Sequence, residues 1–134
     1  MSRGLAVAVA LVVATAAALS ACGGPDAGQQ WRVVAASGLA LERTPEADDR
    51  ELRVRFVVNA LTATPDPVDH VEVTREDGQL GIRVWLRERI PAADEHVPNY
   101  AGHHSATVPL DEPVGQATVV DLGARPPTPV PTRA

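Results

Sequence analysis

The chain has 134 residues, a length that accommodates one domain and leaves no room for a two-domain enzyme. Its 12 basic residues are all arginine and stand against 17 Asp and Glu, so the formal net charge is −5. No stretch gathers these arginines into the basic face that phosphate neutralisation needs, and we therefore expect no nucleic-acid partner. A single cysteine excludes a framework of intrachain disulfides.

Residues 1–21 have the pattern of an export signal. Arg3 supplies a positive charge, and an uncharged, alanine-rich run follows from Gly4 to Leu19. This run is shorter than the roughly 20 residues of a membrane-spanning helix. We therefore expect residues 1–21 to be a signal peptide that is removed.

The segment Leu19-Ser20-Ala21-Cys22 resembles the lipobox of bacterial lipoproteins. The resemblance implies that the Cys22 thiol receives a diacylglyceryl group, that the chain is cut before Cys22, and that the new amine is acylated. Lipidation also accounts for a lone cysteine in an exported protein, which otherwise has no disulfide partner. The alternative is a secretory signal cleaved after Ala18 or Ala21. We expect the lipid anchor at Cys22, which makes the membrane a partner and holds the protein on the outer face of the cytoplasmic membrane.

Two polar segments flank the expected folded domain. Residues 22–30 form a glycine-containing spacer without apolar periodicity, which predicts a flexible tether. Residues 124–134 contain four prolines, which predicts a disordered or polyproline-II tail. We therefore assign the domain to residues 31–123, a size that supports one modest hydrophobic core.

Apolar and polar residues alternate in several short segments of this domain, which is the period of a half-buried strand. The clearest examples are residues 52–58, 71–74 and 80–86. Between the last two, the Asp77-Gly78 step favours the positive φ angles of a tight turn, which predicts an antiparallel hairpin. Further strand candidates are residues 31–35, 39–41, 106–110 and 117–121, with Pro109 marking an edge strand or a strand end.

Short strands separated by prolines leave little room for a helix. They predict an all-β fold, and we expect a small antiparallel β-sandwich of immunoglobulin-like architecture. A small open barrel is the alternative.

Residues 107–121, with Thr-Val-Pro-Leu at their start and Val-Val-Asp at their end, resemble the C-terminal pattern of small secreted or lipid-anchored β-rich proteins of actinobacteria. The resemblance extends loosely back to about residue 51. Members of that group often carry a cysteine pair in the domain, which this chain lacks. The resemblance implies a location and a fold, and it implies no established activity.

Three of the four histidines fall within nine residues, beside Asp94 and Glu95, in an expected loop. Imidazole and carboxylate groups are ligands of zinc and copper, so His96, His103 and His104 are weak candidates for a metal site. Their spacing matches no metal motif, and adjacent His103 and His104 would point to opposite faces of an extended chain. A polar surface loop explains the same composition, and we expect no cofactor.

Asp66, Asp69 and His70 form a second polar group ahead of the hairpin. A carboxylate that orients a histidine suits a general base. The sequence has no Gly-x-Ser-x-Gly segment, however, and no serine in a recognisable catalytic context. Turn-forming aspartates are the alternative interpretation. We therefore expect no catalytic activity.

Arg83, Trp85 and Arg87 share one face of the strand predicted over residues 80–86, and they are the candidate binding surface. An aromatic ring flanked by arginines suits an envelope protein or a polysaccharide partner. Alternatively, a loop covers Trp85 and arginine stems pack over its ring. Together these features predict a lipid-anchored cell-envelope protein that acts as a non-catalytic binding or accessory module. The alternative is a metal-binding envelope protein that uses His96, His103 and His104.

Overall fold

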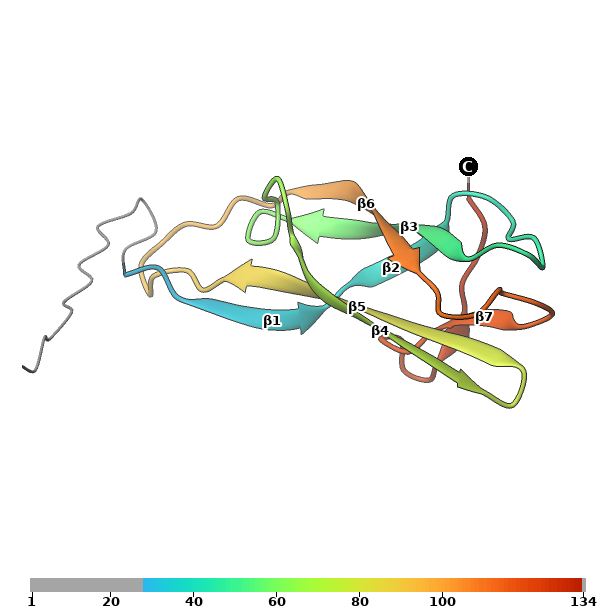
Figure 1. Ribbon diagram of the computed structural model, residues 1–134. Helices are drawn as coiled ribbons and strands as arrows, with labels where there is room; N and C mark the ends of the chain where they lie inside the picture. The colour runs from blue at the N-terminus through green and yellow to red at the C-terminus, as the bar shows by residue number, and fades with distance from the viewer. Residues whose placement is uncertain (1–27, 134) are drawn as a thin grey trace, which may run out of the picture.

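The computed structural model describes residues 28–133, which form strands and connecting loops without a helix (Figure 1). The expected signal peptide, the lipidation site at Cys22 and most of the tether lie outside these residues. Within them, no helix is long and apolar enough to cross a membrane. The strands are β1 (Trp31–Ala35), β2 (Ser37–Leu41), β3 (Glu51–Asn59), β4 (Val68–Glu76), β5 (Gln79–Arg89), β6 (Ala101–Pro109), β7 (Thr118–Asp121) and β8 (Thr128–Pro129).

The strands form two sheets that pack face to face. In the larger sheet, β4 pairs antiparallel with one edge of the 11-residue strand β5. The other edge of β5 pairs antiparallel with β1 over residues 85–89 and parallel with β7 over residues 79–82, and β8 extends this side from β7. The smaller sheet has the order β2-β3-β6, and both of its pairs are antiparallel.

Strict alternation along β3 and β5 decides which side chains form the core. In β3, the apolar positions from Leu52 to Val58 are buried, whereas the intervening arginines face outward. In β5, the apolar positions from Leu80 to Leu86 are buried in the same way. Since successive side chains of a strand point to opposite faces, each sheet presents one apolar face, and the two faces bury each other. The predicted all-β, small antiparallel β-sandwich is confirmed.

The predicted hairpin is present as β4 and β5. Its turn residues, Asp77 and Gly78, have φ angles of 50° and 75°. Both angles are positive, as the tight turns that match strand twist require, and Asp and Gly tolerate this region better than most residues. Glu76 and Gln79 accordingly close the ladder directly beside the turn.

One side of the sandwich is closed by a chain segment that passes from one sheet to the other. β1 belongs to the larger sheet and β2 to the smaller sheet, and Ala36 alone separates them. The Ala36 amide donates to the Val84 carbonyl at 2.8 Å, so the backbone stays paired at the crossing.

The proline-rich tail is ordered up to Arg133, and the expectation of a disordered segment is wrong for these residues. β8 pairs with β7, and the Val130 amide donates to the Val119 carbonyl at 2.9 Å. The tail then reaches the smaller sheet, where the Leu41 amide donates to the Pro131 carbonyl at 2.8 Å and the Arg133 amide donates to the Leu41 carbonyl at 2.8 Å.

The tail docks because its backbone can still form hydrogen bonds despite its four prolines. Proline lacks an N–H, but its carbonyl still accepts a hydrogen bond, and the non-proline residues between the prolines still donate. Val130, the one large aliphatic residue of the tail, is only 9% exposed and belongs to the core. The folded body therefore continues beyond the expected boundary at residue 123.

The opposite side of the sandwich is open. Among the described strands, β4 pairs only with β5, and β6 pairs only with β3. Both sheets thus end on this side in a nine-residue edge strand.

Candidate functional site

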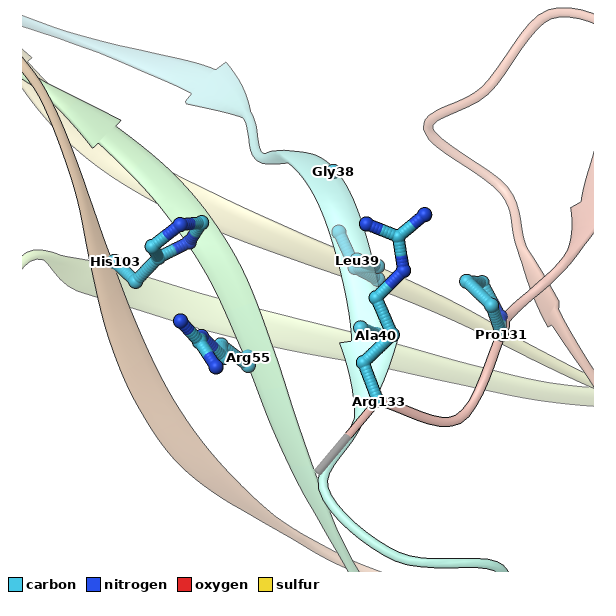
Figure 2. A pocket seen from close by; sticks show the side chains of 7 residues that line it. All are labelled: Gly38, Leu39, Ala40, Arg55, His103, Pro131 and Arg133. Atoms are coloured by element: carbon cyan, nitrogen blue, oxygen red, sulfur yellow. The ribbon is translucent and has the colours of Figure 1, made fainter.

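A pocket of about 320 Å³ opens on the outer face of the smaller sheet. Four separate parts of the chain surround it: β2 forms the floor, β3 and β6 supply one wall, and the tail supplies the other (Figure 2). In Figure 2, Arg55 and His103 stand on one side of β2, and the side chain of Arg133 extends along that strand. The lining residues are Gly38, Leu39, Ala40, Arg55, His103, Pro131 and Arg133.

The strand registers place Arg55 and His103 on this outer face. Val54 and Phe56 are fully buried, so Arg55 between them points away from the core. In the ladder between β3 and β6, His103 lies opposite Val57, one outward position along from Arg55. The Arg55 and His103 side chains are therefore neighbours on adjacent strands, although they lie 48 residues apart in sequence (103 − 55).

An irregularity in β2 shapes the floor. The register of β2 against β3 shifts between Ser37 and Ala40, which marks a β-bulge. Gly38 lies in this bulge with φ +64°, and a Cβ atom there would lie 2.8 Å from Val57 Cγ2. Both the positive φ and the close approach require glycine at this position.

The docked tail brings Arg133 to the pocket. The two backbone hydrogen bonds to Leu41 hold Pro131 and Arg133 against the free edge of β2. The burial of Val130 anchors the same segment in the core. The second wall of the pocket thus depends on core packing 3 residues earlier in the chain (133 − 130).

The two arginines of the pocket have no acidic partner among the described residues. Within residues 28–133, no carboxylate oxygen forms an ion pair with Arg55 or Arg133 at 4.0 Å or less. Five other arginines of the same range have such partners: Arg32, Arg43, Arg53, Arg83 and Arg89.

The acidic group on the same face, Glu42, is committed elsewhere. One of its oxygens accepts from Arg53 Nε at 2.8 Å, and the other accepts a short hydrogen bond from the Ser105 hydroxyl. The Ser105 hydrogen bond is the main reason that the pKa of Glu42 lies below its ordinary value; Arg53 and the positive charge of Arg55 act in the same direction against partial desolvation. Glu42 therefore remains ionised and bound to its own partners, and the pocket keeps a cationic lining.

The three predicted histidines do not converge. His96 lies in the exposed loop between β5 and β6. His103 and His104 lie within β6 and face opposite sides, as expected for adjacent residues of an extended chain: His103 lines the pocket, and the His104 ring packs 5.6 Å from the Phe56 ring. The expectation of a loop over residues 101–104 is wrong, because pairing with the end of β3 extends the strand through a Gly-His-His segment that has no apolar alternation of its own.

One group of three ligating side chains within 4.8 Å of one another occurs in the described range, and it contains none of these histidines. It consists of Glu46, Asp48 and Asp49. Asp49 is already engaged by Arg43 at 2.9 Å and by the Glu46 amide at 2.8 Å. These contacts stabilise a loop, and the cluster gives no argument for a metal.

Asp69 and His70 are in contact, whereas Asp66 forms no side-chain hydrogen bond or ion pair among the described residues. His70 Nδ1 lies 2.7 Å from Asp69 Oδ2, which is the geometry of an oriented imidazole. The other ring nitrogen, Nε2, lies 3.9 Å from a Glu72 carboxylate oxygen and faces no hydroxyl or thiol in this range. Both sides of the ring therefore face carboxylates, and the arrangement has no nucleophile for a base to activate.

Arg83, Trp85 and Arg87 lie on the outer face of the larger sheet, opposite in β5 to the buried Ile82 and Val84. The half-buried Trp85 ring is stacked against His70 at 5.8 Å and is covered by the Arg83 guanidinium at 5.4 Å. Arg83 in turn donates to the Leu122 carbonyl at 2.9 Å. The Trp85 indole is therefore already in contact with two side chains of the protein itself, those of His70 and Arg83.

Arg87 is placed differently from Arg83. Its guanidinium lies 5.0 Å from the centre of the Trp31 ring, on the neighbouring strand β1. Cation–π pairs of this kind hold arginine stems against an aromatic surface. The structure thus places Arg83, Trp85 and Arg87 on one face, but the rings of Trp85 and Trp31 are in contact with neighbouring side chains of the fold.

Arg55 and Arg133 are the site residues that the sequence does not single out. Arg55 is indistinguishable from Arg53 in the alternating pattern of residues 52–58, and only the strand register shows that Arg53 meets Glu42 while Arg55 does not. For Arg133, the sequence offers one indirect signal. Val130 is an isolated aliphatic residue in the proline-rich segment, and such a residue indicates that the segment packs against the core and so brings Arg133 close to the sandwich.

The fold and the pocket together define a small β-sandwich with a cationic cleft on one outer face. No protein-family model, curated protein or solved structure matches the chain.

Proposed function

We propose that this chain is a lipid-anchored protein of the bacterial cell envelope and that its β-sandwich is a non-catalytic binding module for an anionic ligand. The observation that supports the binding role is the pair of guanidinium groups, Arg55 and Arg133, in one pocket without a carboxylate partner among the described residues. The lipobox-like segment that ends at Cys22 supports the anchor.

The chemistry of the lining defines the ligand class. A guanidinium group presents several N–H donors in a plane and binds carboxylate or phosphate oxygens in pairs, with stronger hydrogen bonds than neutral donors make. His103 adds a ring nitrogen on the same wall as Arg55. A ligand with a carboxylate or phosphate group satisfies these donors without the cost of removing an existing acidic partner.

The floor adds a second requirement. Leu39, Ala40 and Pro131 contribute apolar atoms to the lining, beside the two arginines. Ligand sites commonly combine apolar walls with a few placed polar groups. The preferred ligand therefore carries an apolar portion beside its acidic group.

Calorimetry on the purified chain tests the binding role with inorganic phosphate, acetate and longer aliphatic carboxylates. We expect affinity to rise with the length of the aliphatic portion, and Arg55→Gln and Arg133→Gln each to weaken binding about 10-fold or more, since a charged hydrogen bond contributes roughly 1.5–3 kcal/mol. Arg87→Gln is the matched control, because Arg87 also lacks a carboxylate partner among the described residues but lies on the other sheet. Equal losses in all three variants would contradict a specific pocket.

The anchor is tested separately. Cys22→Ala, or inhibition of lipoprotein signal peptidase with globomycin, should change membrane attachment: the variant should leave the membrane fraction, and the inhibitor should cause the uncut precursor to accumulate. A Cys22→Ala variant that has lost its signal peptide and still stays membrane-bound after a high-salt wash contradicts lipidation at Cys22 and leaves the binding role intact.

A further inference from the structure

We propose that the free edge of β4, with the groove beneath it, binds an extended segment of a partner protein in which apolar and basic residues alternate. This edge lies on the open side of the sandwich, away from the cationic pocket, and the inference is independent of the proposed anionic ligand. It rests on three observations: an unpaired strand edge, an apolar groove under that edge, and an acidic rim.

The edge of β4 is long and uncovered. β4 spans nine residues and pairs with β5 alone among the described strands. The free edge of β2, in contrast, is covered at Leu41 by the backbone of the tail. An unpaired edge presents a row of backbone N–H and C=O groups that can pair with another extended chain.

The groove lies on the inner side of this edge. By register, Val71 and Val73 face the same side as the buried Val84 and Ile82. Val73 is nevertheless 38% exposed, because no strand of the smaller sheet reaches over it. A groove of about 540 Å³ runs along these valines, with Pro109 and Leu110 on its other wall.

Arg75 closes one end of the groove. Its guanidinium donates to the carbonyls of Glu112 and Pro113, the latter at 2.8 Å, and so ties β4 to the loop after β6. At the other end of the strand, a register shift between Val68 and His70 distorts the ladder. Docking is therefore confined to the stretch of β4 between these two points.

The surroundings of the edge are acidic. Carboxylates line both sides of it. Arg75 is bound to backbone carbonyls, and Arg83 donates to the Leu122 carbonyl and lies 3.6 Å from Glu72, whose charge it partly offsets. Glu76, Asp111 and Glu112 form no ion pair among residues 28–133 and leave this edge with a net negative charge. A second copy of this chain would bring the same acidic edge and be repelled, whereas a basic segment would be attracted. The acidic residues are Asp69, Glu72 and Glu76 on β4, and Asp111 and Glu112 beside the groove.

The register determines the pattern of the partner. A strand added to β4 sends alternate side chains to its two faces. Those on the inner face meet Val71 and Val73, and they must be apolar to fill the groove. Those on the outer face lie beside Glu72 and Glu76, and basic side chains fit there.

Fluorescence anisotropy with the full-length chain in detergent tests this proposal. The probe is a labelled peptide of about eight residues, within the usual length of a strand, in which Val and Lys alternate. The comparison peptides have the same composition in two blocks, or alternate Val with Glu. We expect only the alternating Val–Lys peptide to bind, and its amide contacts to protect the backbone of Val71 and Val73, whose amides face the free edge, from hydrogen exchange.

Variants locate the binding. Val73→Lys should weaken binding at least 10-fold, because it fills the groove and adds a like charge, and Glu72→Gln should weaken it to a smaller extent. Val33→Lys, at a valine that is 46% exposed on the other side of the larger sheet, should change nothing. Unchanged urea midpoints in all three variants show that the fold is retained.

Any of these binding results would overturn the proposal: no binding of the alternating Val–Lys peptide at millimolar concentration, equal binding of the block peptide, or equal affinity in Val73→Lys. Concentration-dependent dimerisation that Val73→Lys abolishes would also overturn it, in favour of a second copy at this edge. Arg133→Gln should leave peptide binding unchanged, so that loss of the pocket and loss of the edge are distinguishable.

Discussion

Replacing Val130 with alanine tests whether the C-terminal tail belongs to the fold. Val130 is 9% exposed and packs in the core between the two sheets, although it lies among four prolines. If the tail is docked as the structure shows, this single residue anchors it. If the tail is a disordered linker, as its composition predicts, the substitution has no effect on stability.

The magnitude follows from the atoms removed. Val130→Ala deletes two buried methyl groups, each about 0.8 kcal/mol of transfer free energy, and leaves a small cavity that adds to the cost. We therefore expect the free energy of unfolding to fall by about 2 kcal/mol. For a domain of this size, such a loss lowers the melting temperature by about 8 °C.

Urea denaturation followed by tryptophan fluorescence measures this change, since Trp31 and Trp85 both lie on the larger sheet. Val33→Ala is the matched control: it deletes the same atoms from a valine that is 46% exposed and should cost no more than about 0.5 kcal/mol. Equal effects of the two substitutions would refute the docked tail. The same experiment at the pocket should show weaker anion binding in Val130→Ala, because Arg133 loses its support.

Three further predictions concern other parts of the structure. Gly38→Ala should destabilise the fold by about 1–3 kcal/mol more than Gly115→Ala in thermal unfolding, because both glycines have positive φ but only a Cβ at Gly38 would meet a neighbour, at 2.8 Å; equal costs would contradict the close approach. Hydrogen bonds from Arg89 to both oxygens of Glu95 hold the pKa of Glu95 below its ordinary value. Since the folded-state pKa is lowered, the pair stabilises the fold at neutral pH, and this contribution is lost as the pH falls through the folded-state pKa. NMR titration of the Glu95 carboxyl measures its pKa directly. The difference in unfolding free energy between the protein and Glu95→Gln should also shrink in acid. Arg32→Ala should lower the urea midpoint more than Glu88→Ala. In Arg32→Ala, the Glu88 carboxylate, whose side chain is only 10% exposed, stays in place without its two hydrogen bonds, whereas in Glu88→Ala the 56% exposed Arg32 side chain is solvated by water. A larger loss in Glu88→Ala would contradict this explanation.

The sequence predicts a strand or a turn correctly where the residues of that element alone have a clear pattern. The alternation in residues 52–58 predicts β3 and its buried face, and the Asp77-Gly78 step predicts the hairpin between β4 and β5. The opposite orientation of His103 and His104 follows from the geometry of any extended chain. These features need only the two-residue period and the turn preferences of single residues.

The first half of β6 shows where this reasoning stops. Residues 101–105 contain glycine, histidine and serine without apolar alternation, and they form a strand because β3 offers an unpaired edge beside them. Backbone hydrogen bonds do not depend on side-chain pattern, so a strong strand can extend a weak neighbour.

By itself, the sequence determined the all-β class and most of the strands, and it predicts an export signal with a lipobox-like end at Cys22, because each of these patterns lies in consecutive residues. Only the tertiary structure decided that the tail is part of the sandwich and that Arg55, His103 and Arg133 share a pocket. The physical reason is that ion pairing and burial depend on which distant segments meet: Arg53 finds Glu42 and Arg55 does not, and Val130 finds the core.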